Sequence, residues 1–149
     1  FRGLSFGASY DDIVENEGYP PVQRQEDRVK TDLVYLETLA RYEFAAIYSL
    51  VNDEFVLGQY LLTEGIDDMA TYQEIYGDVK AVLEERYGAP SSHETVGSLD
   101  EMERIEVYGE TVWGDDEHTL RLRYFRQEGW VLQVLYEHQE RTEELQPTV

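Results

Sequence analysis

The chain of 149 residues contains no cysteine, and none of its hydrophobic runs approaches the roughly 18 residues that a membrane-spanning helix requires. The lack of cysteine excludes disulfide bonds, thiolate catalysis and zinc sites built on thiolates. Residue 1 is Phe and not Met, so we expect either a processed form or a shortened chain, with the leader outside this sequence. A chain of this length can bury about two-thirds of its unfolded surface without covalent or metal support, so we expect one compact domain.

Positive charge is also scarce. The 12 Lys and Arg stand against 32 Asp and Glu, which gives a formal net charge of -20. This charge repels nucleic acids and anionic lipids, so we expect neither as a partner. Hydrophobic residues at 42% and aromatic residues at 13% are too frequent for a disordered chain, so we expect the protein to fold despite its self-repulsion.

The acidic residues are spread along the whole chain, and Lys30 and Lys80 are the two lysines. A dispersed acidic shell suits a protein that works in concentrated salt, and it also suits the solvated surface of an ordinary acidic protein. We therefore retain a halophilic protein as a hypothesis. Cooperative unfolding with equal stability from low to molar salt would contradict it.

Thr71 to Pro90 has the clearest pattern of an amphipathic helix. Thr71 with Glu74 matches a capping box at the start, Gly88 permits the left-handed conformation that closes a helix, and Pro90 prevents its continuation. One stripe of the helix is apolar and consists of Tyr72, Ile75, Tyr76, Val79, Val82 and Leu83.

The segment before it has a similar order on a smaller scale. Ser9 is placed to cap a short helix over Tyr10 to Glu17, which Gly18 and Pro20 end. The polar segment 21–29 is predicted as a loop, and three strands are predicted at 32–39, 42–51 and 54–63, with Asn52-Asp53 as a two-residue turn. After the second helix we predict a polar loop at 91–102 and strands at 103–113, 119–126 and 129–138.

These patterns predict an α+β fold made of two tandem α-β-β-β units, which form one antiparallel sheet with both helices on one face. The units are residues 1–63 and 71–138 of a single domain, 1–138, joined by the linker 64–70. Residues 139–149 are predicted to form a flexible tail. The side chains predicted to face the helices are Leu120, Leu122, Tyr124, Trp130, Leu132 and Val134.

Two short motifs carry a family resemblance. The opening Phe1-Arg2-Gly3-Leu4-Ser5-Phe6-Gly7-Ala8-Ser9 and the later Leu83-Glu84-Glu85-Arg86-Tyr87-Gly88-Ala89-Pro90 resemble segments of small exported bacterial proteins and lipoproteins of unknown role. The order of helices and strands also resembles the repeats of β-lactamase-inhibitor-protein-like folds. The resemblance implies an exported, periplasmic or envelope-associated protein that binds another protein through a sheet face, and it supplies no catalytic residue. The chain departs from the secreted inhibitors in lacking their paired cysteines.

The excess of aromatic residues gives the first hypothesis about function. Tyr60 and Tyr108 fall on the alternate phase of their predicted strands and are expected to face away from the helices, together with Arg121, Arg123 and Gln133. Tyr and Arg offer large contact area at low entropic cost, so these five residues are the predicted contacts of a partner protein. The alternative is ordinary cross-strand packing on a solvated sheet, with Arg121 and Arg123 paired to Glu106 or Glu110.

A second hypothesis concerns the turn Gly114-Asp115-Asp116-Glu117-His118. Asp115, Asp116 and His118 are residue types that bind calcium or zinc. Their spacing matches neither the twelve-residue calcium loop nor a two-histidine zinc pattern, so we expect a solvated turn and no cofactor. The alternative to a protein-binding module is a small-ligand-binding or hydrolytic domain. Its pocket would lie between sheet and helices, with His118 and nearby acids as polar groups.

Overall fold

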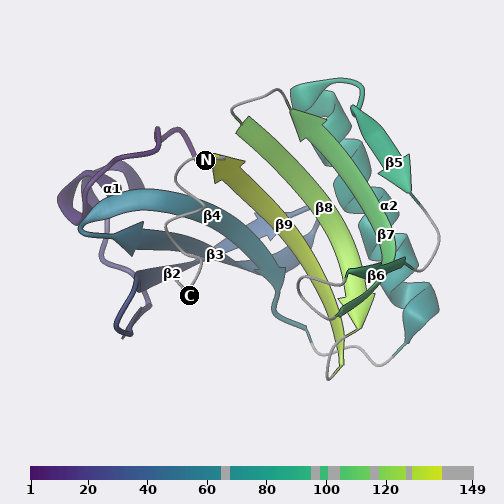
Figure 1. The fold of residues 1–149 in the computed structure, drawn as a ribbon, viewed down its shortest axis with the longest axis horizontal. Helices are drawn as coiled ribbons and strands as arrows, with labels where there is room; N and C mark the ends of the chain where they lie inside the picture. Colours follow the sequence, from purple (N-terminus) through teal and green to yellow (C-terminus); the bar gives the residue numbers. More distant parts are fainter. Residues whose placement is uncertain (65–67, 95–97, 101–104, 115–117, 127–128, 139–149) are drawn as a thin grey trace.

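The computed structural model describes residues 1–64, 68–94, 98–100, 105–114, 118–126 and 129–138. These residues form a mixed α+β structure that consists mostly of sheet (Figure 1). The elements, in chain order, are α1 (Tyr10–Glu17), β1 (Gln23–Glu26), β2 (Thr31–Leu39), β3 (Tyr42–Val51), β4 (Glu54–Leu62), α2 (Met69–Tyr87), β5 (Ser92–Glu94), β6 (Ser98–Asp100), β7 (Ile105–Gly114), β8 (His118–Arg126) and β9 (Trp130–His138).

All strand pairings among these elements are antiparallel and belong to one sheet. The spatial order is β1-β2-β3-β4-β9-β8-β7-β5, and β6 also pairs with β7. The strands from the two halves of the chain meet in the middle of the sheet, where β4 pairs with β9. In this pair Leu57 lies opposite Glu137 and Leu61 opposite Gln133. The predictions of an α+β fold and of an antiparallel sheet are confirmed.

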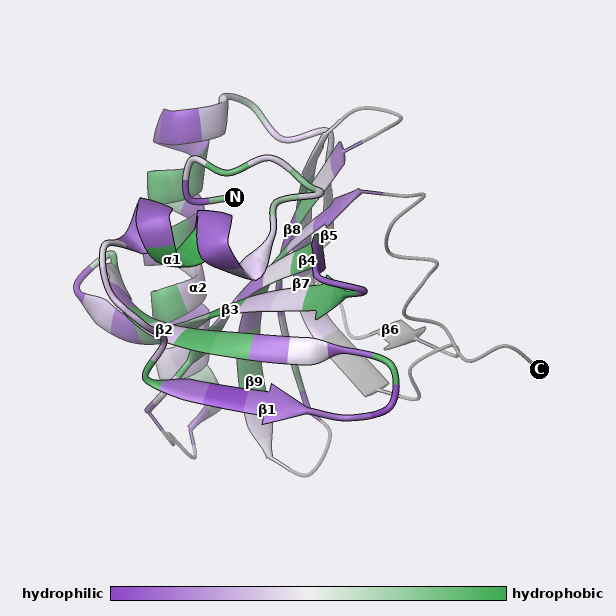
Figure 2. Cartoon of the chain, turned by 90° about the vertical axis from the view of Figure 1, so that its left-hand side faces the viewer, coloured by the Kyte–Doolittle hydropathy of each residue, from purple (hydrophilic) through white to green (hydrophobic). Residues whose placement is uncertain are grey.

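The six long strands and α1 lie within two residues of their predicted limits, whereas the short strands were missed. β1 lies in the segment predicted as the loop 21–29, and β5 and β6 lie in the segment predicted as the loop 91–102. β1 is a hydrophilic edge strand whose four residues are all exposed, as Figure 2 shows by its colour. A short charged strand of this kind protects a sheet edge and has no alternating pattern for sequence analysis to detect.

The start of α2 also differs from the prediction. The helix begins at Met69, and the capping residue is Asp68, whose carboxylate accepts hydrogen bonds from the Ala70 amide at 3.1 Å and the Thr71 hydroxyl at 2.7 Å. Thr71 is therefore inside the helix, and the predicted linker 64–70 ends before Met69. Gly88 ends the helix as predicted, but with a φ of 86° and a ψ of -158° it lies outside the left-handed helical conformation that was expected.

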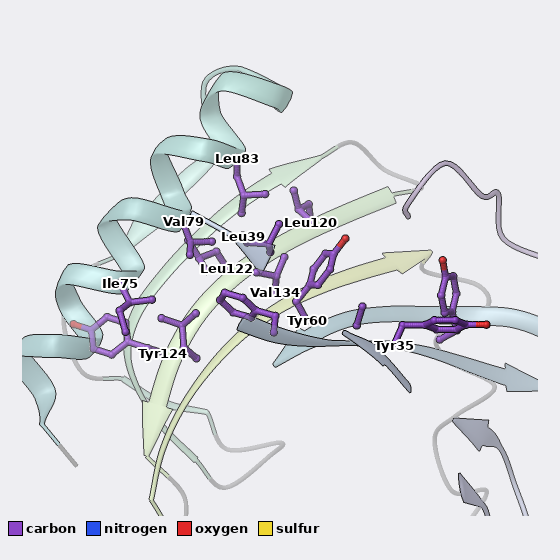
Figure 3. Close-up of a cluster of buried hydrophobic side chains, with 14 of the residues drawn as sticks. Tyr35, Leu39, Tyr60, Ile75, Val79, Leu83, Leu120, Leu122, Tyr124 and Val134 are labelled. Carbon is purple, nitrogen blue, oxygen red and sulfur yellow. The ribbon is translucent and has the colours of Figure 1, made fainter. Parts of the chain in front are cut away.

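One set of buried side chains, which we call the core cluster, holds the sheet and helices together (Figure 3). From the helices it includes Ile13 of α1 and Ile75, Val79 and Leu83 of α2. From the strands it includes five residues of the predicted helix-facing set, namely Leu120, Leu122, Tyr124, Leu132 and Val134, and Trp130 packs against it partly buried. The alternation predicted for β8 and β9 is thus confirmed.

Two β-bulges shift this alternation elsewhere in the sheet. In β4, Leu57 pairs with Ser49 and Phe55 with Leu50, which leaves Val56 as an extra residue. In β7 the register shifts between Val107 and Gly109, so Tyr108 is the extra residue. Each bulge changes which side chains of its strand face the core cluster.

Candidate functional site

The sheet face opposite the core cluster, which we call the back face, is the most extensive candidate surface. Strand alternation and the register of the pairs assign its side chains. They include Val34, Leu36, Ala45, Ile47, Leu57, Gln59 and Leu61 from β2–β4, and Val112, Arg121, Arg123, Phe125, Val131, Gln133 and Leu135 from β7–β9.

A line of hydrogen-bonded polar side chains crosses the middle of the back face. The Gln133 amide donates to Gln59 Oε1 at 2.8 Å, and Arg123 Nε donates to Gln133 Oε1 at 2.9 Å. The Arg123 guanidinium lies 4.9 Å from the centre of the Phe125 ring, and the residue is only 3% exposed. This line, which we call the polar ladder, fixes the rotamers of its members before any partner arrives.

The part of the back face on β2–β4 is apolar and more accessible. We call Val34, Leu36, Ala45, Ile47, Leu57 and Leu61 the apolar strip. Val34 lies opposite Ile47, and Leu36 opposite Ala45, which in turn lies opposite Leu61. Leu36 is 46% exposed, and the other five are half-buried. Neighbouring strands lie about 4.8 Å apart, so these side chains form one continuous surface.

The structure places three of the five predicted contact residues on the back face. Arg123 and Gln133 belong to the polar ladder, and Arg121 lies in the same sheet face with its Nε 3.8 Å from Glu110 Oε2. The expected pairing of an arginine with Glu110 is therefore present, and it is diagonal because Glu110 lies directly opposite Arg123.

The predicted orientation of Tyr60 and Tyr108 is wrong. Tyr60 is 8% exposed and belongs to the core cluster, because the bulge at Val56 moves the later residues of β4 to the opposite phase. Tyr108 is the bulge residue of β7, and its ring packs against Trp130 at 4.9 Å. Both side chains belong to the core side of the sheet and cannot contact a partner on the back face.

A second candidate lies on the core side, where a cavity of about 340 Å³ is bordered by Arg2, Asn16, Glu17, Glu37, Tyr60 and Arg86. Arg2 holds Glu17 through two hydrogen bonds, Nε to Oε1 at 2.6 Å and Nη2 to Oε2 at 2.7 Å, and it also binds Glu37. The Tyr48 hydroxyl donates to Glu17 Oε1 at 2.5 Å. We call Arg2, Glu17, Glu37 and Tyr48 the ion cluster.

The electrostatics of the ion cluster follow from its burial. The Glu17 side chain is 5% exposed, which by itself raises the pKa of its carboxyl group. The hydrogen bonds from Arg2 and Tyr48 and the charge of Arg2 outweigh burial, so the pKa of Glu17 lies below its ordinary value. Burial raises the pKa of Tyr60, which the nearby Arg2 opposes. Three of the charged groups at this cavity, Arg2, Glu17 and Glu37, are therefore already paired with each other.

His118, the residue suggested for a metal site or a ligand pocket, does not border this cavity. It lies directly opposite His138 across the β8–β9 pair, beside the rings of Phe6 and Tyr136. Asp115 and Asp116, the other suggested metal ligands, lie outside the described residues. Within the described residues, no three or more His, Asp and Glu side chains are grouped so that they could hold a metal ion.

Sequence reasoning missed Gln59, the apolar strip and the ion cluster. Strict alternation from Phe55 would place Leu57 and Leu61 on the helix-facing side, and the bulge at Val56 moves them to the back face. The ion cluster joins residues that are 15 to 35 positions apart, and no short motif links them. Glu17 was one sequence signal for the ion cluster, because α1 has no basic residue in its last turn. A carboxylate that becomes buried requires a cation beside it, and that cation must then come from another segment.

Comparisons with protein families, with curated proteins and with solved structures find no match to this chain. In the part of the chain that the structure describes, neither helix has the length and apolar character needed to cross a membrane. The assignment of function therefore rests on the surfaces described above.

Proposed function

We propose that the protein is a non-enzymatic module that binds another protein through its back face. The observation that carries the proposal is the apolar strip beside a preorganised polar ladder. An apolar contact surface with a few fixed hydrogen-bonding groups is the composition of protein interfaces. The partner contacts in the proposal are Arg121 and Gln133, as predicted, together with Gln59 and Leu36, whereas the predicted contact Arg123 is 3% exposed and holds the Gln133 side chain in place.

The net charge selects the kind of partner. With -20 on each copy, two copies repel each other over the distances that salt does not screen, and polyanions are repelled as well. A basic protein is attracted at long range instead, which raises its association rate. The proposed partner is therefore a different, basic protein with an apolar contact surface that fits the strip.

The runner-up, a small-ligand-binding or hydrolytic domain, uses the cavity beside the ion cluster. This cavity supports the runner-up because it lies on the core side of the sheet, where the ligand pocket was expected, and has Tyr60 and Arg86 at its border. Against it, Glu17 and Glu37 are both bound to Arg2, so neither carboxylate is available as a separate polar group for a ligand.

We further infer the finer architecture that the sequence suggests, in which 1–63 and 71–138 are two related α-β-β-β units with both helices on one face. Three observations support it: each helix precedes its long strands, each half contains one bulge, and both helices contribute to the same core cluster. The exported or envelope location implied by the family resemblance stays a prediction.

The proposal is tested with a photo-crosslinking amino acid placed at Leu36 or at Tyr87. The two positions are equally accessible, at 46% and 47%, but Tyr87 lies at the end of α2, away from the back face. In an extract of the source organism, we expect a basic protein to be crosslinked from Leu36 and not from Tyr87.

The crosslinked protein, purified, should bind at least about tenfold more weakly to the Leu36→Glu variant than to the Tyr87→Glu variant, and more weakly in high salt. Equal crosslinking from both positions, or equal binding by both variants, contradicts the proposal. Tyr60 and Tyr108 are unsuitable for this mapping because their substitution would disturb the core cluster.

A further inference from the structure

His118 and His138 form a pair that the proposed function does not use. They are directly opposite each other in the β8–β9 register, and their ring centres lie 5.0 Å apart with the ring planes at 86°. Both residues are half-buried, and the Nδ1 atom of His138 is itself buried. The pair lies on the same side of β8 and β9 as the core cluster, since its register positions alternate with Arg121 and Glu137 of the back face.

Two aromatic rings restrict the orientation of this pair. Phe6 is stacked against His118 at 6.0 Å and meets His138 edge-on at 5.6 Å. Phe6 is itself stacked on Tyr136 at 5.2 Å with an interplanar angle of 9°. The two imidazoles are therefore held side by side by their strands and by this aromatic support, which lowers the entropic cost of bringing both to one ligand.

We propose that His118 and His138 are a two-imidazole binding site for a divalent transition-metal ion, with water in the remaining coordination positions. Histidine nitrogens bind such ions at about 2.0–2.1 Å, and two imidazoles on one tetrahedral ion have ring centres roughly 5 Å apart. The observed separation of 5.0 Å meets this requirement. Imidazole suits Cu²⁺, Ni²⁺ and Zn²⁺, with Cu²⁺ bound most tightly, and it does not suit Mg²⁺ or Ca²⁺.

The acidic character of the protein favours cation binding at this site, but it does not determine which metal ion binds. A net charge of -20 raises the concentration of all cations near the surface. This effect does not distinguish Ni²⁺ from Mg²⁺, whereas two imidazoles do. The site is independent of the proposed partner surface, so its failure would leave the protein-binding proposal intact.

The test is calorimetric titration of the untagged full chain with NiCl₂, ZnCl₂ and MgCl₂ in a buffer that does not bind metals. The variants are His118→Gln and His138→Gln, and the matched control is His93→Gln, which removes the third histidine of the chain. We expect one equivalent of Ni²⁺ or Zn²⁺ to bind to the unmodified protein and to His93→Gln. Each of the other two variants should bind at least about tenfold more weakly, because loss of a ligand costs no less than the loss of an outer-shell partner of a ligand.

A spectroscopic measurement covers the case in which a variant does not fold. The electron paramagnetic resonance spectrum of the unmodified protein with one equivalent of Cu²⁺ reports the number of imidazole nitrogens bound to the ion. Two nitrogens support the site, and one or none overturns it. Absence of saturable Ni²⁺ or Zn²⁺ binding, or equal binding by all three variants, overturns it as well and leaves the pair as aromatic packing.

Discussion

The two helices are attached to the same sheet by different physical means. α1 has eight residues and buries only Ile13, whereas α2 has 19 residues and buries Tyr72, Ile75, Tyr76, Val79 and Leu83. The short helix lacks the apolar area to hold itself in place, because each buried aliphatic side chain contributes only about 1.5–3 kcal/mol. The difference shows how a fold compensates for a helix that is too short to be held by its own apolar stripe.

Around α1 the compensation comes from the ion cluster and from the first residues of the chain. Arg2 connects Glu17 at the end of α1 to Glu37 on β2. Phe1 packs against Tyr48 at 5.1 Å and against Tyr60 at 5.1 Å, so the segment before α1 fills the space that a longer helix would cover.

Around α2 the buried polar contacts are neutral, and the charged Asp78, whose side chain is 38% exposed, accepts a hydrogen bond from the Tyr42 hydroxyl at 2.9 Å at the helix surface. The Tyr76 hydroxyl bonds Thr111 Oγ1 at 2.5 Å, the Tyr72 hydroxyl donates to the Trp130 carbonyl at 3.2 Å, and Trp113 Nε1 donates to the Gly88 carbonyl at 2.9 Å. The comparison therefore predicts that the attachment of α1 depends on pH more strongly than that of α2, whose charged contact lies at the exposed Asp78.

The largest effect is expected when the ion cluster loses its cation. Arg2→Met leaves Glu17 buried without its charged partner, and we expect it to reduce the free energy of unfolding at pH 7 by about 3 kcal/mol, the lower end for a broken buried pair. Glu37→Gln is the matched control. Because the Glu37 side chain is 36% exposed, its loss should cost less than about 1 kcal/mol after solvent screening. Urea unfolding followed by circular dichroism measures both.

The pH dependence of this variant tests the sign of the effect. In the unmodified protein the pKa of Glu17 is lower in the folded than in the unfolded state. Its contribution to stability is therefore present above the unfolded value, near 4.5, and is lost as the pH falls through the folded value. In Arg2→Met, burial dominates and raises the pKa of Glu17, so the stability difference from the unmodified protein should shrink as the pH falls from 7 toward 4. A constant difference over this range contradicts the assignment.

The second effect compares two glycines, one in each half of the sheet. A Cβ on Gly109 would lie 2.3 Å from Tyr124 Cε1, and a Cβ on Gly58 would lie 2.5 Å from Phe1 Cγ. The Tyr124 ring is confined by Tyr76 and Trp130, whereas the Phe1 ring belongs to an irregular segment outside the helices and strands. We expect Gly109→Ala to cost about 1–3 kcal/mol and Gly58→Ala to cost less.

The reason for this asymmetry can be tested in a double variant. If the Phe1 ring is what resists a side chain at residue 58, Gly58→Ala should become nearly neutral in a Phe1→Ala background. Thermal unfolding measures all four proteins. Equal costs for Gly58→Ala with and without the ring would contradict the proposed role of Phe1.

The bulges explain why the sequence predicted the strands well and one candidate surface poorly. Alternation places Leu120, Leu122 and Leu132 correctly, because β8 and β9 run without interruption. It fails for Tyr60 and Tyr108, because a bulge adds a residue without leaving a sequence signal. The ion cluster and the pairing of His118 with His138 depend on contacts between distant segments, which only the folded chain brings together.

The third effect concerns the neutral contact beneath α2. Tyr76 is buried, which raises the pKa of its hydroxyl to about 12 and keeps it uncharged over the usual pH range. Tyr76→Phe should reduce the free energy of unfolding by about 1 kcal/mol, the net contribution of one hydrogen bond. This loss should be the same at pH 5 and pH 8, in contrast to that of Arg2→Met. A loss that changes with pH would contradict the distinction between the two helices.

The smallest effect is expected at the helix starts, where sequence and structure disagree about α2. Ser9 accepts a hydrogen bond from the Asp12 amide at 3.2 Å, and the Asp12 carboxylate accepts one from the Ser9 amide at 3.0 Å. Ser9→Ala should therefore destabilise α1 by about 1 kcal/mol. For α2, Asp68→Ala should reduce the melting temperature more than Thr71→Ala, because Asp68 is the residue that caps the helix.

The matched control for the cap of α2 is Asp68→Asn, which retains a side-chain oxygen for the Ala70 amide and should keep most of the stability. Hydrogen exchange at the first turn of α2 localises the change and separates it from α1. A larger loss from Thr71→Ala than from Asp68→Ala would restore the capping box that the sequence predicted. The expected result, a larger loss from Asp68→Ala, would place the capping residue of α2 three residues before Thr71. The longer helix that results is the one already held to the sheet by its apolar contacts.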